Sequence, residues 1–176
     1  MRALAAIASL AALAACVSPA QITTTQLLAA DAATSLAVGE RVTQIVSSRE
    51  GGEGQDAIVS LSLRHADGRA LSFQEGNHTP NDLIATGAGG ALAQIMGLPG
   101  EETTRLFHAT AADSQNAFFC GPDGPAAIGT YEGADGVLQI VGLRQAIAFE
   151  TRADGVTEAL PYSPDQVCAR LRFRRG

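Results

Sequence analysis

The sequence predicts a mainly β fold, a small antiparallel sandwich or barrel built from hairpins, with one or two short helices. The prediction rests on a repeated turn sequence and on the alternation of apolar and polar residues on both sides of it. The tripeptide Ala-Asp-Gly occurs at residues 66–68, 134–136 and 153–155, each time between segments in which apolar and polar residues alternate. Asp-Gly between alternating runs is a strong short-range signal for a β-hairpin. Three such hairpins in one chain indicate an antiparallel meander.

The strands follow from this alternation. An alanine-rich segment at 27–36 is expected to form a short helix before the first strand, which we expect at 39–48. A glycine-rich loop at 51–54 is expected to follow that strand. Another loop is expected at 110–114. About 140 residues bury roughly two-thirds of the unfolded surface, enough for one core. In chain order, we expect strands at 39–48, 57–64, 69–74, 103–108, 128–132, 137–141, 146–150, 156–160 and 166–173.

The segment 79–100 differs from its surroundings and predicts a helix. Pro80, Asn81 and Asp82 can open it, and three bulky residues share one of its faces: Leu92, Ile95 and Met96. Gly97, followed by Leu98 and Pro99, is a helix stop of the left-handed glycine type. A phosphate-binding loop at 87–90 is the alternative, but the third glycine position is Leu92 and no lysine follows.

Composition excludes one broad class of function. The 176-residue chain has a net charge of −6 and no lysine, so all 12 basic residues are arginines. A nucleic-acid-binding protein normally carries a cationic stripe. We therefore expect no nucleic-acid partner. The arginines 170, 172, 174 and 175 form a local basic face, which could contact anionic lipid or glycan or be balanced by acidic loops.

The N-terminus has the pattern of a secretory signal peptide at residues 1–15. Met1 and Arg2 precede an uncharged, mostly apolar run from Ala3 to Ala15. This run is too short to span the hydrocarbon core of a membrane. Polar residues and Pro19 interrupt its continuation towards Ala30, which disfavours a transmembrane helix.

The sequence Leu13, Ala14, Ala15, Cys16 ends this segment and resembles the lipobox of bacterial lipoproteins. The resemblance implies cleavage before Cys16 and acylation of its sulfur and its new amino terminus. Val17 and Ser18 follow, without the aspartate that retains enteric lipoproteins in the inner membrane, which implies an outer-membrane anchor facing the periplasm or the exterior. In the alternative, an ordinary signal peptide, Cys16 is a spare thiol. Residues 16–35 are expected to be the lipidated cysteine and a tether, and 36–176 a single β-rich domain.

The two remaining cysteines, Cys120 and Cys168, form an even pair for a compartment in which disulfides persist. We expect a bridge between them. One detail opposes it: by strand parity Cys168 shares the face of Arg170 and Arg172 rather than the apolar face. The alternatives are two free thiols or a metal site, which would lack further ligands. No metal and no cofactor are expected.

Few residues suggest catalysis. His65 and His108 lie at strand ends and are expected to be exposed or structural, whereas His78 lies in a polar loop where Glu75 and Asp82 could support a general base. Polar loop composition explains the same residues without chemistry. The serine-elbow, zinc-protease and β-lactamase motifs do not occur in the sequence. We therefore expect a protein without enzymatic activity, with a hydrolase using His78 as an alternative.

The run Phe118, Phe119, Cys120, Gly121, Pro122 looks like the aromatic-x-Cys opening of membrane-bound lysozyme-inhibitor lipoproteins. That resemblance implies a lipid-anchored β-barrel that inserts a loop into an enzyme cleft. The glycine after the cysteine is displaced by one residue, and the Ser-Gly-x-x-Tyr loop has no counterpart at 160–164. The sequence thus favours a lipid-anchored envelope protein with an interaction domain for an envelope protein or glycan, the alternative being a periplasmic inhibitor of an exogenous hydrolase such as lysozyme.

Overall fold

The computed structural model describes residues 21–39, 42–50, 58–76, 88–98, 104–110, 117–160 and 163–176. The predicted signal peptide, Cys16, the 51–54 loop, and the loop with His78 lie outside these ranges. The elements are β1 (Gln21–Thr25), β2 (Leu27–Ala29), α1 (Ala32–Val38), β3 (Val42–Glu50), β4 (Ile58–His65), β5 (Ala70–Glu75), α3 (Ala88–Met96), β6 (Arg105–Ala109), β7 (Ala127–Glu132), β8 (Val137–Leu143), β9 (Phe149–Thr151), β10 (Thr157–Ala159), the 3-10 turn η2 (Pro164–Gln166) and β11 (Val167–Arg175).

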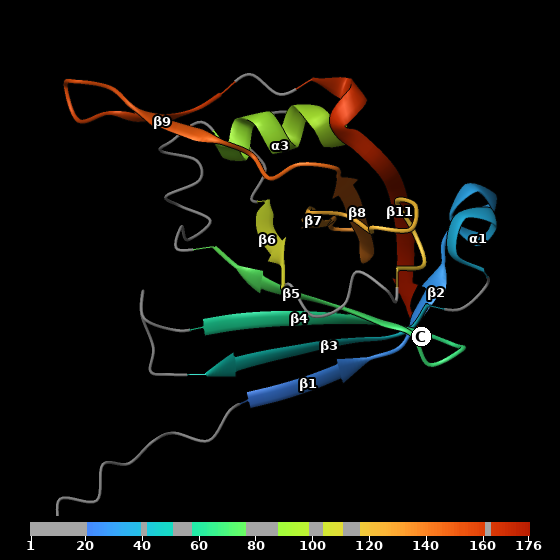
Figure 1. The fold of residues 1–176 in the computed structure, drawn as a ribbon. Helices are drawn as coiled ribbons and strands as arrows, with labels where there is room; N and C mark the ends of the chain where they lie inside the picture. Colours follow the sequence, from blue (N-terminus) through green and yellow to red (C-terminus); the bar gives the residue numbers. More distant parts are fainter. Residues whose placement is uncertain are drawn as a thin grey trace, which may run out of the picture.

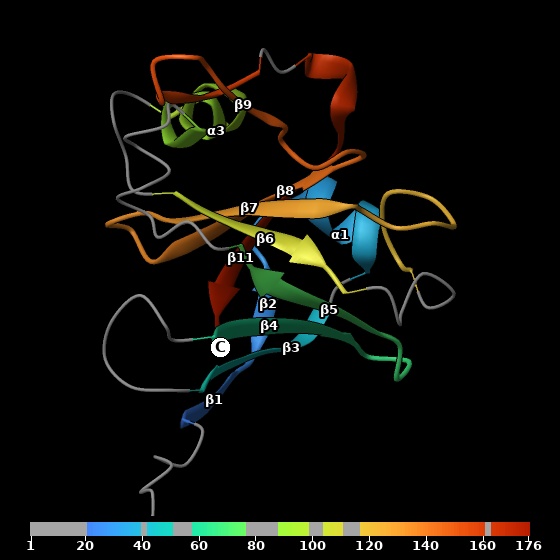
Figure 2. The ribbon, with the colours of Figure 1, turned by 60° about the vertical axis from the view of Figure 1, so that its left-hand side comes forward.

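The main sheet confirms the predicted fold class. Its nine antiparallel strands run in the order β1-β3-β4-β5-β6-β7-β8-β11-β2, and β9 and β10 form a separate hairpin. The two edge strands, β1 and β2, are consecutive in the chain and separated only by Gln26. One bent segment therefore pairs with β3 through its first half and with β11 through its second half. The sheet thereby curls into a nearly closed barrel (Figures 1 and 2).

This arrangement corrects the expectation for the residues before position 36. The sequence predicts a tether up to residue 35, with a helix over 27–36. Instead, residues 21–25 and 27–29 are strands of the sheet, and the helix is confined to Ala32–Val38. The helix begins where Asp31 accepts a hydrogen bond from the Thr34 backbone N–H at 2.8 Å, a typical N-cap. The sequence pattern does not reveal these strands because pairing of β1 with β3 and of β2 with β11, rather than alternation, holds them in place.

The three Ala-Asp-Gly turns adopt one geometry, which confirms the predicted hairpins. In each turn the glycine has a positive φ, between 72° and 95°, and the aspartate accepts a hydrogen bond from the backbone N–H two residues later. The glycine N–H also donates to the carbonyl of the residue before alanine, as in Gly136 to Gly133 at 2.9 Å. These features define a turn that ends in a left-handed glycine. One such turn joins β4 to β5, another joins β7 to β8, and the third joins β9 to β10.

The main core fills the barrel interior. Its side chains come from alternate positions of the strands, and α1 contributes Val38. The aromatic members Phe73, Phe107 and Phe173 are at most 2% exposed. The inward positions of the apolar strands thus follow the period-2 pattern that the sequence displays.

A second, smaller core lies on the outer face of β7 and β8, beneath α3 (Figure 1). Leu92 is fully buried, and Met96 is buried beside it, as the predicted apolar helix face requires. Gly129 on β7 permits this close approach: a Cβ there would lie 2.8 Å from Leu92 Cδ2. The predicted helix stop is also confirmed, because Leu98 N–H donates to the carbonyl of Ala93 and Gly97 has a φ of 70°.

Candidate functional site: a cavity at the open end of the barrel

Among the residues that the structure describes, different segments lie at the two ends of the barrel. One end, which we call the closed end, carries the β4–β5 hairpin, α1 and the segment 117–126 between β6 and β7. The other end, which we call the open end, carries the β7–β8 hairpin, the last residue of β11 and the start of β1. Figure 2 separates them: the β7–β8 hairpin and the start of β1 lie at the left, and the β4–β5 hairpin lies at the right.

Two phenylalanines plug the closed end. Phe118 and Phe119 are 9% and 6% exposed, and their rings meet edge to face with centroids 5.3 Å apart. The ring of His65 lies 5.2 Å from that of Phe118. Arg69 holds the same segment by donating from Nη1 to the carbonyl of Ala117 at 2.9 Å. This end therefore functions as a packed lid rather than as an entrance.

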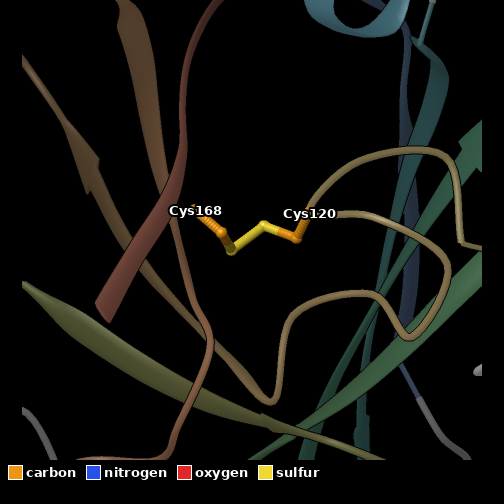
Figure 3. The surroundings of a disulfide bond; sticks show 2 residues. All are labelled: Cys120 and Cys168. Carbon is orange, nitrogen blue, oxygen red and sulfur yellow. A yellow bond between two sulfur atoms is a disulfide. The ribbon is translucent and has the colours of Figure 1, made fainter. Parts of the chain in front are cut away.

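The predicted disulfide ties this lid to the last strand (Figure 3). Cys120 and Cys168 are bonded, with their Cα atoms 5.0 Å apart. The parity argument against the bridge fails because the register of β11 against β8 shifts between Val167 and Ala169. Cys168 is the extra residue of this β-bulge, so its side chain is redirected away from the face of Arg170. Cys120 itself has a positive φ of 67°, within a turn that Gly121 continues.

The open end contains a cavity of about 310 Å³. Its walls come from seven strands distributed around the barrel. The apolar part consists of Ile45, Leu61, Phe107 and Leu138, and the polar part includes the hydroxyls of three threonines. The complete lining is Thr23, Thr25, Ile45, Leu61, Arg105, Phe107, Thr130, Tyr131, Glu132, Leu138 and Arg175.

Two arginine–glutamate pairs stand at this end. Arg105 binds Glu75 through two hydrogen bonds, Nε to Oε1 at 2.8 Å and Nη2 to Oε2 at 2.7 Å. The Glu75 side chain is only 10% exposed, whereas that of Arg105 is 41% exposed. Arg175 binds Glu132 with Nη2 2.5 Å from Oε2, in a more exposed setting. Arg105 also lies over the Phe107 ring, 5.2 Å from its centroid. The rim thus presents balanced charges of both signs above an apolar floor.

These groups can form hydrogen bonds with a bound ligand. Each rim carboxylate accepts a charge-assisted hydrogen bond from its arginine, through both oxygens in Glu75 and through Oε2 in Glu132. The hydroxyls of the lining threonines can donate or accept hydrogen bonds to a ligand. A cavity of this size, with an apolar floor and a few polar groups, matches the lower range of small-ligand sites.

Sequence reasoning missed most of this site. Thr23 and Thr25 fall in the expected tether, and Arg105 has no distinguishing signal in its strand. The sequence groups Arg175 with the basic face of the last strand, but Leu171, Phe173 and Arg175 share the inward parity. That parity is the signal that could have found it. The outward Arg170 and Arg172 have partners of their own, the carbonyl of Ile95 and, at 3.9 Å, Asp31.

The two described histidines, His65 and His108, do not line this cavity. His65, at the closed end, has Nε2 2.8 Å from the carbonyl of Val38, which confirms the expected structural role. Its Nδ1 lies 2.9 Å from Asp67. Backbone hydrogen bonding from Arg69 is the largest cause that lowers the pKa of Asp67 to about 2.

His108 is half-buried on β6. His78 and Asp82 lie outside the described residues, so their proposed meeting with Glu75 is untested; Glu75 itself binds Arg105.

Within the described ranges, no group of three or more histidine, cysteine, aspartate or glutamate side chains is arranged to hold a metal ion. Over the same ranges, no helix has both the length and the apolar character needed to cross a bilayer.

Comparisons with known proteins leave the cavity as the main guide to function. No protein-family model, curated protein or solved structure matches this chain.

Proposed function

We propose that this protein is a lipid-anchored component of the cell envelope whose barrel domain binds a ligand without catalysing a reaction. The lipobox-like sequence ending at Cys16 supports the anchor, and Val17 after it, in place of the aspartate that retains enteric lipoproteins in the inner membrane, supports the outer membrane. The Cys120–Cys168 bridge supports export, because disulfides persist in oxidising compartments. The observation that carries the binding role is the cavity at the open end.

The anchor is tested by replacing its cysteine. We expect the Cys16→Ala variant to be found in the soluble periplasmic fraction and to take up no radioactive palmitate, because the acylated sulfur is gone. The matched control is the Cys120→Ala/Cys168→Ala variant, which keeps Cys16 and should remain membrane-bound and labelled. Membrane retention and labelling of Cys16→Ala would reject the lipoprotein assignment.

The binding role is tested by crosslinking in intact cells followed by purification. A protein or glycan partner would appear as a discrete crosslinked species, whereas a small ligand would leave the protein at its own mass. Hydrolysis of envelope substrates that is lost in a His78→Ala variant would instead support an enzyme and reject the non-catalytic role.

Inhibition of an exogenous hydrolase is the second candidate, favoured by one feature. The β9–β10 hairpin projects from the barrel (Figure 1), and two apolar residues near it are exposed, Val156 at 45% and Leu160 at 42%. An inserted apolar loop can block an enzyme cleft. A lysozyme assay with the purified protein tests this: inhibition that is lost in Val156→Asp would support it, and absence of inhibition would reject it.

A further inference from the structure

We infer that the open end of the barrel faces the bilayer that carries the anchor, and that its cavity receives a single-chain amphiphile from that bilayer. This inference rests on the proposed acylation of Cys16. It adds to that proposal an orientation and a class of ligand. Three observations carry it: where β1 begins, how tall the barrel is, and what lines the cavity.

The first observation is the short reach of the chain after the anchor. Only residues 17–20 separate Cys16 from Gln21, the first residue of β1. A fully extended chain spans at most about 3.6 Å per residue, so Gln21 lies within about 18 Å of the acylated cysteine. Gln21 pairs with Arg49 near the end of β3, which places it at the open end. The anchor therefore attaches at the same end as the cavity.

The second observation is the height of the barrel. β3 and β11 contain nine residues each. Nine residues in a strand extend about 30 Å, and the usual tilt of barrel strands reduces the height to roughly 23 Å. If the closed end rested on the membrane, Gln21 would lie roughly 23 Å above the membrane surface. The chain from Cys16 to Gln21 spans only about 18 Å and could not reach that far. The open end is consequently the end that lies near the lipid headgroups.

The third observation is the match between the cavity and an amphiphile. Its apolar floor, formed by residues such as Leu61, Phe107 and Leu138, would bury a hydrocarbon chain and remove it from water. The arginine–glutamate pairs at the rim offer charged partners of both signs to a headgroup. The volume of about 310 Å³ lies at the lower end of the range for small-ligand sites, which suits one chain rather than two.

Ile22 provides an independent contact with the membrane surface. Its side chain is 68% exposed and lies on the outer face of β1, beside the cavity-lining Thr23. An exposed apolar side chain at this place can enter the interfacial region of the bilayer. It also marks a position at which the orientation can be measured.

The orientation test uses the absence of tryptophan from the natural chain. The acylated Ile22→Trp and Pro122→Trp proteins, with reporters at the open and closed ends, are placed in phosphatidylethanolamine–phosphatidylglycerol vesicles with partly brominated acyl chains. We expect strong quenching of the tryptophan at 22 and little at 122. Equal quenching, or stronger quenching at 122, overturns the inference. The mass of the same preparations reports the lipid on Cys16: its absence would reject the proposed function, whereas its presence with quenching at 122 would reject the orientation alone.

The ligand test uses two neighbouring positions on one strand. Both threonines are exposed, but Thr23 lines the cavity, whereas Thr24 points to the opposite face of β1. The acylated proteins are incubated with dodecanoate or with lysophosphatidylethanolamine, and bound molecules are counted by native mass spectrometry. We expect one amphiphile per protein, a Kd at least about tenfold higher for Thr23→Trp, and no change for Thr24→Trp. The two probes distinguish a free fatty acid from a lysolipid as the source. Absence of both adducts, or an equal loss in both variants, overturns the ligand assignment.

Discussion

Gly142 lies directly against Cys120: a Cβ at position 142 would stand 2.6 Å from Cys120 Sγ. The same atom would be 3.1 Å from a ring carbon of Phe119 and 3.2 Å from Cys168 Sγ. The glycine on β8 therefore makes the space into which the disulfide and the aromatic plug fit. Backbone freedom is not its role, because its φ is not in the left-handed region.

Gly142→Ala should consequently destabilise the protein by about 1–3 kcal/mol, the usual cost of overpacking a core. Chemical denaturation of the two proteins measures this difference. The control is the same substitution in a Cys120→Ala/Cys168→Ala background, where the sulfurs are absent and the cost should fall. An equal cost in both backgrounds would show that the disulfide is not what Gly142 accommodates.

Removal of the disulfide should lower the free energy of unfolding by roughly 4 kcal/mol. The bridge closes a loop with a sequence separation of 48 residues, and the loop-entropy relation gives this value for such a length. Denaturation of the Cys120→Ala/Cys168→Ala variant measures it. Alkylation of the unreduced wild-type protein should add no mass at these two cysteines, and an added mass would show free thiols.

Leu92→Ala should destabilise the protein by about 2–5 kcal/mol, because it leaves a cavity where a fully buried leucine joins α3 to β7 and β8. Gln94→Ala is the control on an exposed position of the same helix and should have little effect. Thermal unfolding compares the two. Similar melting temperatures for both variants would contradict the packing of α3 on the sheet.

The charge of Asp67 should make stability depend on acid pH. Its folded-state pKa of about 2 is below the ordinary value of 3.8, so the carboxylate stabilises the folded state above about pH 4. This contribution is lost as the pH falls through about 2. Asp67→Asn keeps the turn oxygen and removes the charge. The difference in melting temperature between wild type and Asp67→Asn should therefore shrink from about pH 5 to about pH 2, and a constant difference would contradict the assignment.

The parts of the fold that sequence could predict are those with local causes. The Ala-Asp-Gly turns need only a carboxylate and a glycine at fixed positions, and the stop of α3 needs only Gly97 and Leu98. The parts that it could not predict depend on distant partners. The bulge that redirects Cys168 appears only when β11 is aligned with β8. The cavity similarly requires the barrel to bring Thr23, Arg105 and Arg175 together.

The bent first segment, which contains β1 and β2, limits the order in which the sheet can form. β2 pairs with β11, so the hydrogen bonds that bring the sheet edges together join the beginning of the described chain to its end. Leu27, a buried core residue, cannot reach its place opposite Arg175 before the last strand is available. Closure of the sheet must therefore wait until β11 is available, and contacts of such long sequence separation form slowly. A chain shortened by its last strand would leave two unpaired edges, which are sites for aggregation.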